Sequence, residues 1–180
     1  MKTLLFFTFL SFNSFIFCQN LSLSQLVELR KKDLGNAEEF LTAKGWEFLD
    51  GDDAGPEKMG RITFTYNKSE MSSRAESFLD FYSGKYSNRV HIQVNKKVKY
   101  NEYINAIKGY GCKLISSNIE DGNLVKIYRG ATTTFEVSSG TSSNFYNEET
   151  AIWNITIFSN EDYELNFEHY QIKEDYSEEA

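Results

Sequence analysis

The residues best suited to acid–base or nucleophilic chemistry are few in this 180-residue sequence. Its two histidines are His91, in a strand-like segment, and His169, in an acidic tail. Cys112 lies in an apolar pattern typical of a buried small hydrophobic residue. No serine or cysteine stands in a nucleophile motif such as G-x-S-x-G. The sequence therefore disfavours Ser-His-Asp and Cys-His hydrolysis.

Three aspartates in the stretch DGDDAGPE, at positions 50, 52 and 53, could in principle hold Ca²⁺. An EF-hand loop starting at Asp50 would need an oxygen ligand at its fifth position and Glu at its twelfth. Those positions hold Ala54 and Arg61, so we interpret the stretch as a solvated turn. Two widely spaced histidines make a zinc site unfavourable, and there is no Gly-rich phosphate loop. We expect neither a metal nor a cofactor.

Paired carboxylates for glycoside hydrolysis need only meet in space, so a small secreted hydrolase is kept as a third hypothesis. The acidic residues lie mainly in turns and in the C-terminal tail. A chain of this size also has limited room for a deep cleft. We therefore expect a protein that is not an enzyme.

The first 18 residues have the pattern of a signal peptide. Lys2 precedes an apolar run from Leu4 to Phe17, which is too short and too interrupted for a membrane span. Cleavage after Cys18 is favoured over lipidation of that cysteine, because lipoprotein processing requires a small residue before the cysteine and Phe17 stands there. We expect an exported bacterial protein, periplasmic or extracellular, with no integral membrane segment after cleavage.

Charge is unevenly distributed along the chain. Residues 159–180 hold eight acidic residues and one lysine, whereas the formal net charge of the whole chain is −7. The rest is nearly neutral, and neither part would attract a polyanion, which argues against nucleic-acid binding. Within the acidic C-terminal tail, 159–180, alternation over 162–168 predicts an extra edge strand, and disorder is expected past Gln171.

The elements predicted for residues 19–95 are helices followed by four strands. Ser22 and Gln25 have capping-box spacing, and Asn36 with Glu39 could cap a new helical turn. Helices are expected at about 22–33 and 36–44, or as one helix kinked at Gly35, with a left-handed stop at Gly45. Trp46 is then expected to anchor the first strand in the core. Period-two alternation predicts strands at 46–50, 61–66, 76–82 and 89–94.

The pattern restarts in residues 96–158. A helix ending at Gly109 precedes strands predicted at 111–118, 123–128, 133–137 and 151–158, and Tyr110 occupies the place of Trp46. The motif Ser-Gly-x-x-Ser-Asn recurs at 83–88 and 139–144. We therefore predict an α+β fold made of a tandem α-β4 repeat, with units 19–95 and 96–158, whose antiparallel sheets carry helices packed on one face. The alternative is chance recurrence.

The strand pattern also predicts a binding surface on the sheet face turned away from the helices. Alternation assigns six residues to the core: Leu79, Phe81, Val90, Ile92, Val125 and Ile127. Their neighbours would then face outward, as a mixture of aromatic and polar groups typical of protein-binding surfaces: Phe78, Tyr82, His91, Gln93, Lys126 and Tyr128.

These features favour a protein-binding module of the inhibitor, immunity or adaptor type, which would act by steric occlusion of a protein partner through a sheet face. The alternative is a structural or assembly component of the bacterial envelope. The sequence identifies no particular partner.

Overall fold

The computed structural model describes residues 21–56, 58–69, 75–143 and 149–168, so the predicted signal peptide lies outside the described residues. The first half contains α1 (Leu23–Arg30), α2 (Leu34–Thr42), β1 (Trp46–Asp52), β2 (Gly60–Tyr66), β3 (Ser77–Ser83) and β4 (Asn88–Val94). The second half contains α3 (Lys97–Gly109), β5 (Lys113–Glu120), β6 (Asn123–Arg129), β7 (Thr133–Ser143), β8 (Glu149–Ser159), α4 (Asn160–Tyr163) and a π-helical turn, η1 (Glu164–Glu168). Each of the eight strands predicted between residues 46 and 158 overlaps an observed one.

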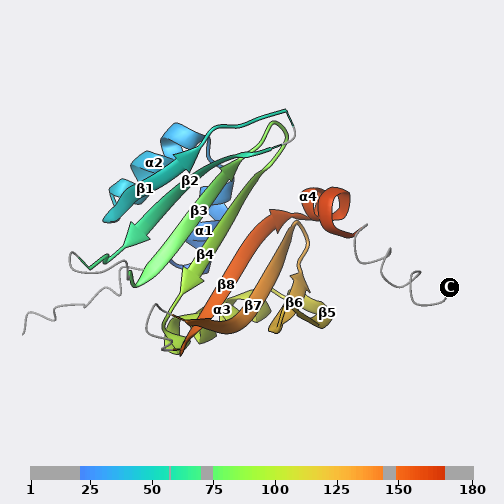
Figure 1. The fold of residues 1–180 in the computed structure, drawn as a ribbon. Coiled ribbons are helices and arrows are strands. Elements are labelled where there is room, and N and C mark those ends of the chain that lie inside the picture. Colours follow the sequence, from blue (N-terminus) through green and yellow to red (C-terminus); the bar gives the residue numbers. More distant parts are fainter. Residues whose placement is uncertain (1–20, 57, 70–74, 144–148, 169–180) are drawn as a thin grey trace, which may run out of the picture.

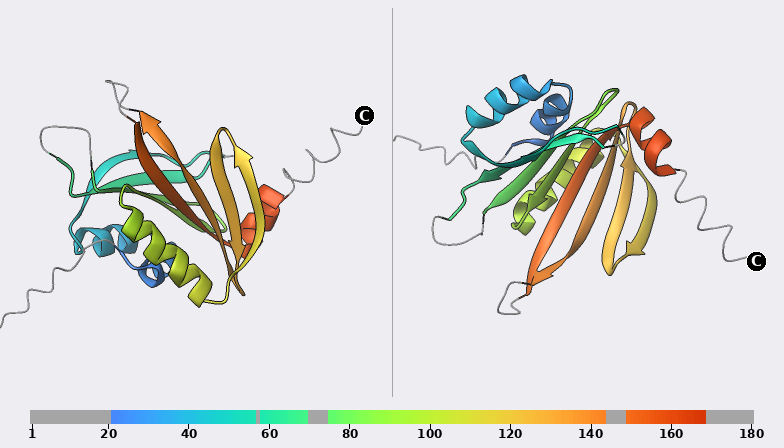
Figure 2. Two further views of the ribbon diagram at one scale, coloured as in Figure 1. Left: turned by 90° about the horizontal axis from the view of Figure 1, so that it is seen from below. Right: turned by 45° about the horizontal axis from the view of Figure 1, so that its top comes forward.

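All eight strands form one antiparallel sheet in the order β1-β2-β3-β4-β8-β7-β6-β5, with the junction between β4 and β8 (Figure 1). The prediction of a tandem α-β4 repeat, in which each unit's sheet carries its own helices, is therefore wrong. The helices α1, α2 and α3 gather on one side of the sheet and make their main contacts with β1, β3, β4 and β8 (Figure 2). They do not divide into one set for each group of four strands.

Local sequence signals explain where several elements begin and end. Ser22 and Gln25 form the predicted capping box, with the Ser22 side chain accepting from the Gln25 N–H and the Gln25 side chain accepting from the Ser22 N–H. The second helix is capped by Asp33 rather than by Asn36. Gly45 has φ of 80°, the left-handed conformation expected of a glycine after a helix. Asp121 and Gly122 both have positive φ, which suits the tight β5–β6 turn.

The main core lies between the sheet and the three helices. Leu26 of α1, Leu41 of α2 and Ile107 of α3 are fully buried there against Phe64 and Ile92 of the sheet. Trp46 is 1% exposed and anchors β1, as predicted, whereas Tyr110 is 54% exposed. The expectation that Tyr110 would be the buried counterpart of Trp46 is therefore wrong, because α3 packs on β4 and α1 instead of covering its own strands.

A second, smaller cluster lies on the opposite face of the sheet. It consists of Val125, Ile127, Phe158 and Tyr163, with the rings of Phe158 and Tyr163 5.6 Å apart in an edge-to-face arrangement. Since Tyr163 belongs to α4, this short helix covers the far end of β6 and β8. The extra edge strand predicted for 162–168 is not formed, because residues 160–168 are helical.

Candidate binding face

The face of the sheet turned away from α1, α2 and α3, here called the open face, carries a row of polar residues across five strands. Directly paired residues in antiparallel strands share a face. The pairs Thr63–Asp80, Asp80–His91, His91–Thr156 and Thr156–Glu136 therefore line up from β2 to β7, and we call these five residues the polar row.

Hydrogen bonds tie the polar row together. The Thr63 hydroxyl donates to Asp80 Oδ1 at 2.6 Å, and His91 Nδ1 lies 3.0 Å from the Thr156 hydroxyl. In the next row along the strands, Asn154 Nδ2 donates to the Ser138 hydroxyl at 3.2 Å. These cross-strand contacts satisfy polar groups on a face that the three helices leave uncovered, and they hold its side chains in place.

Burial shifts the pKa of two members of the polar row, His91 and Glu136, and of the neighbouring Tyr82. Burial lowers the pKa of His91, against the opposing charge of Asp80 and a hydrogen bond with Asn154, so the imidazole is neutral at pH 7. Burial raises the pKa of Glu136, and the charge of Glu120 raises it further. Burial, followed by the charge of Asp80, also raises the pKa of Tyr82.

Four of the six predicted binding residues lie together on the open face. Phe78 pairs with Gln93, two residue pairs along from Asp80 and His91, while Tyr82 pairs with Arg89, two residue pairs along on the other side of that row. All four side chains are partly exposed. The four therefore form one patch on the neighbouring strands β3 and β4.

The other two predicted residues, Lys126 and Tyr128, lie on the helix-covered side of the sheet. Tyr128 is 6% exposed, belongs to the main core, and pairs with the core residue Phe135. Lys126 pairs with the core residue Val137. Val125 and Ile127, which were assigned to that core, instead face the opposite side, where they form the smaller cluster.

Five acidic, hydroxyl and amide members of this face were not predicted from the sequence: Asp80, Glu136, Thr63, Thr156 and Asn154. Asp80 sits between Leu79 and Phe81 in β3, so alternation alone could have assigned it to the open face. Its alignment with Thr156 and Glu136 depends on the β4–β8 pairing, which joins distant parts of the chain. No local pattern signals that pairing.

The order carboxylate, imidazole, hydroxyl in Asp80, His91 and Thr156 contains the residue types that activate a hydroxyl nucleophile. The surroundings do not suit that chemistry. Both β4 and β8 are paired on each side, so their backbone N–H groups are used in the sheet, leaving no pair of free donors beside Thr156 for an oxyanion. The hydrogen bonds of the polar row instead link side chains on neighbouring strands.

Comparison with family models, curated proteins and solved structures found no match to this chain. The described residues contain no cluster of three His, Cys, Asp or Glu side chains placed to hold a metal ion. Two aspartates of the DGDDAGPE stretch, Asp50 and Asp52, form ion pairs with Arg61 of β2, at 3.3 and 2.7 Å. Within the described ranges, no helix is long and apolar enough to cross a membrane.

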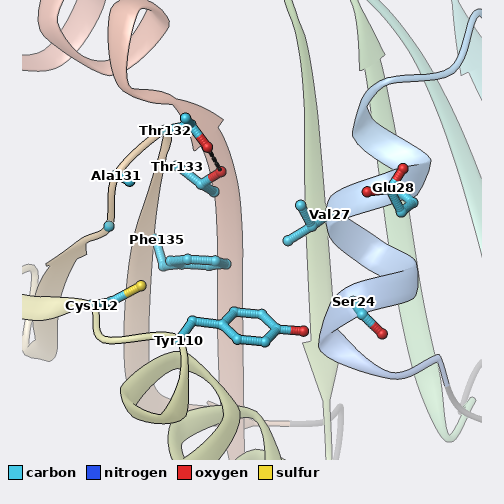
Figure 3. A pocket seen from close by; sticks show the side chains of 10 residues that line it. Ser24, Val27, Glu28, Tyr110, Cys112, Ala131, Thr132, Thr133 and Phe135 are labelled. Carbon is cyan, nitrogen blue, oxygen red and sulfur yellow. Dashed lines mark hydrogen bonds between the residues drawn. The ribbon is translucent and has the colours of Figure 1, made fainter.

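Two cavities lie among the described residues, and the wider one borders the open face at Arg89. One, of about 320 Å³, opens between α1 and the β6–β7 turn, with Val27, Tyr110, Cys112 and Phe135 among its walls (Figure 3). Cys112 is partly buried, and burial raises the pKa of its thiol, which favours the thiol over the thiolate. A wider hollow of about 770 Å³ lies between the 54–59 loop and α4.

Proposed function

We propose that this chain is an exported, non-enzymatic protein-binding module of the inhibitor, immunity or adaptor type. Its partner would be a protein whose surface is covered by the open face, and the effect would be steric. The observation that carries the proposal is the patch of Phe78, Tyr82, His91 and Gln93 on β3 and β4.

The composition of this patch supports a protein partner. An aromatic ring, a phenol and an amide, each partly exposed, are the groups that supply apolar contact and hydrogen bonds at the centre of protein interfaces. His91 lies between Asp80 and Thr156 and is held by a hydrogen bond, so it supports its neighbours rather than presenting a charge.

The scaffold also supports this reading. The patch sits in the middle of an eight-stranded sheet whose other side is packed against the main core. A face held in one conformation before binding loses little entropy when a partner docks. Enzymatic use is disfavoured because Asp80 and Glu136 are three strand spacings apart, roughly 14 Å along the sheet. Paired carboxylates in glycosidases lie about 5–10 Å apart.

The test is capture of a partner by the immobilised chain from an extract of its own organism, followed by mass spectrometry. We expect Tyr82→Ala and Gln93→Ala to reduce capture of the same protein at least about tenfold, as for interface hot spots. Tyr110→Ala is the matched control, since it removes a tyrosine that is 54% exposed on the other side of the sheet.

Thermal unfolding of each variant separates lost binding from lost stability. Support requires capture lost with Tyr82→Ala at an unchanged melting temperature and retained with Tyr110→Ala. A partner captured equally well by all three variants would exclude the open face as the binding surface.

A further inference from the structure

The strand β5 is an exposed edge of the sheet. It pairs with β6 on one side and stands last in the strand order. Every residue of β5 except Ser116 is exposed, and Leu114 and Ile119 are 52% and 79% exposed. An exposed edge with apolar side chains and unpaired backbone groups is a template for another strand.

A β-bulge in β5 determines which residues at the two ends of the strand share a face. The register with β6 shifts between Leu114 and Ser116, so Ile115 is an extra residue. As a result Leu114 and Ile119 lie on the same face, opposite Tyr128 and Leu124 of β6. Lys113 and Glu120, at the two ends of the strand, share the open face.

We propose that two copies of this chain pair through β5 in antiparallel register about a twofold axis at Ser117, extending the sheet across the dimer. This register places Leu114 opposite the second copy's Ile119, Ser116 opposite its Asn118, Ser117 opposite its Ser117, and Lys113 opposite its Glu120. Ile115 of each copy is left out of this pairing, and the two residues of each pair lie on the same face of the extended sheet. Each apolar and each charged pair then occurs twice, as an isologous interface requires.

Charge complementarity favours a second copy of this chain as the partner, and β5 as the edge strand through which the two copies pair. Lys113 and Glu120 oppose each other only when β5 meets its own sequence in reverse. The other edge of the sheet, β1, carries Glu47, Asp50 and Asp52 as its only charged residues, so two copies of β1 would repel. A single strand pair is at the small end of specific interfaces, so we expect dissociation constants of about 10–500 µM.

Sedimentation equilibrium at low ionic strength tests the pairing, because exposed ion pairs are screened by salt. We expect the natural chain to dimerise, and Lys113→Glu or Glu120→Lys alone to raise the dissociation constant roughly tenfold or more, since each creates two like-charge pairs. The double variant Lys113→Glu/Glu120→Lys restores opposite charges and should recover the dimer. A monomer up to millimolar concentration, or a double variant as weak as the single ones, overturns the proposal.

Cross-linking tests the register. In a chain carrying Cys18→Ser and Cys112→Ala, Ser117→Cys should form a disulfide-linked dimer on mild oxidation, because directly opposed residues have Cα atoms about 4.5–5.5 Å apart. Asn101→Cys, on the exposed surface of α3, is the control and should stay monomeric. A dimer that Ser117→Cys fails to cross-link, or one that Asn101→Cys cross-links equally, would also overturn the proposal.

Discussion

The two halves of the sheet differ in what covers them, and this difference decides which side chains become core. Strands β1 to β4 pack against α1, α2 and α3, whereas β5 and β6 extend past these helices. The same Lys-Gly-aromatic sequence enters both halves, yet Trp46 is 1% exposed and Tyr110 is 54% exposed. Burial in this molecule is therefore set by helix placement rather than by the local strand pattern.

The second half compensates on the opposite face. Its smaller cluster uses Val125 and Ile127 with Phe158, and α4 provides the cover through Tyr163. The carboxylate of Asp162, in the same short helix, receives two hydrogen bonds from Arg89 of β4, at 2.7 and 2.9 Å. The helix α4 thus joins the two halves across the open face.

The largest expected difference is between a leucine of the main core, Leu26 in α1, and a partly exposed leucine of the second half, Leu124 in β6. Leu26→Ala removes a side chain that is 0% exposed, and we expect a loss of about 3–4 kcal/mol in the free energy of unfolding. Leu124→Ala removes one that is 39% exposed on β6, and we expect a loss below about 1 kcal/mol. Urea unfolding measures both. Similar losses for the two variants would mean that the second half is also covered.

Breaking the link made by α4 should have the next largest effect. Asp162 is 4% exposed, so Asp162→Asn removes from a mostly buried site the carboxylate charge that faces the Arg89 guanidinium. We expect a loss of about 2–3 kcal/mol, less than for a fully buried pair because Arg89 is 21% exposed.

The matched control for this link is Glu161→Gln, which changes an exposed acid in the same helix. Equilibrium unfolding in urea should give an unchanged stability for the control. A loss in Asp162→Asn no greater than that in Glu161→Gln would show that α4 does not join the halves.

Local signals were enough to predict the strands and several turns of this fold, because they depend on neighbouring residues. The Ser22–Gln25 capping box and the left-handed Gly45 are examples. The joining of β4 to β8 could not be predicted, since it pairs segments about sixty residues apart, such as His91 and Thr156. That missing pairing also hid the single sheet.

The candidate site could be predicted only in strands where one set of alternate residues is clearly apolar and the other is not. In β3, Leu79 and Phe81 define the core side, so Phe78 and Tyr82 were correctly placed on the open face. In β6, both parities contain apolar residues: Leu124 and Tyr128 on one side, Val125 and Ile127 on the other. Alternation could not decide which of these two sides faces the helices, and the prediction interchanged the two faces of β6.

The smallest expected effect is a difference between the two halves in how folding stability depends on pH. Because burial raises the pKa of Glu136, on β7, the folded chain holds that proton more tightly than the unfolded chain. Its contribution to stability is then lost as pH rises from about 4.5, the ordinary pKa, through the folded value. Glu136→Gln keeps the shape without the charge, so we expect it to be more stable than the natural chain at pH 7, by up to about 1 kcal/mol, and equal to it near pH 4.

The comparison residue is His91, on β4, where burial lowers the pKa below 6.5. The unfolded chain then binds a proton more readily, so this contribution to stability is lost as pH falls below about 6.5. The advantage of Glu136→Gln should therefore grow with pH, whereas any advantage of His91→Gln over the natural chain should grow as pH falls. Thermal unfolding of both variants at pH 4, 5.5 and 7 measures the two trends. Only a group that titrates differently in the folded and unfolded chains makes stability depend on pH. A stability advantage of Glu136→Gln that is constant across this range would therefore contradict a raised pKa for the Glu136 carboxyl.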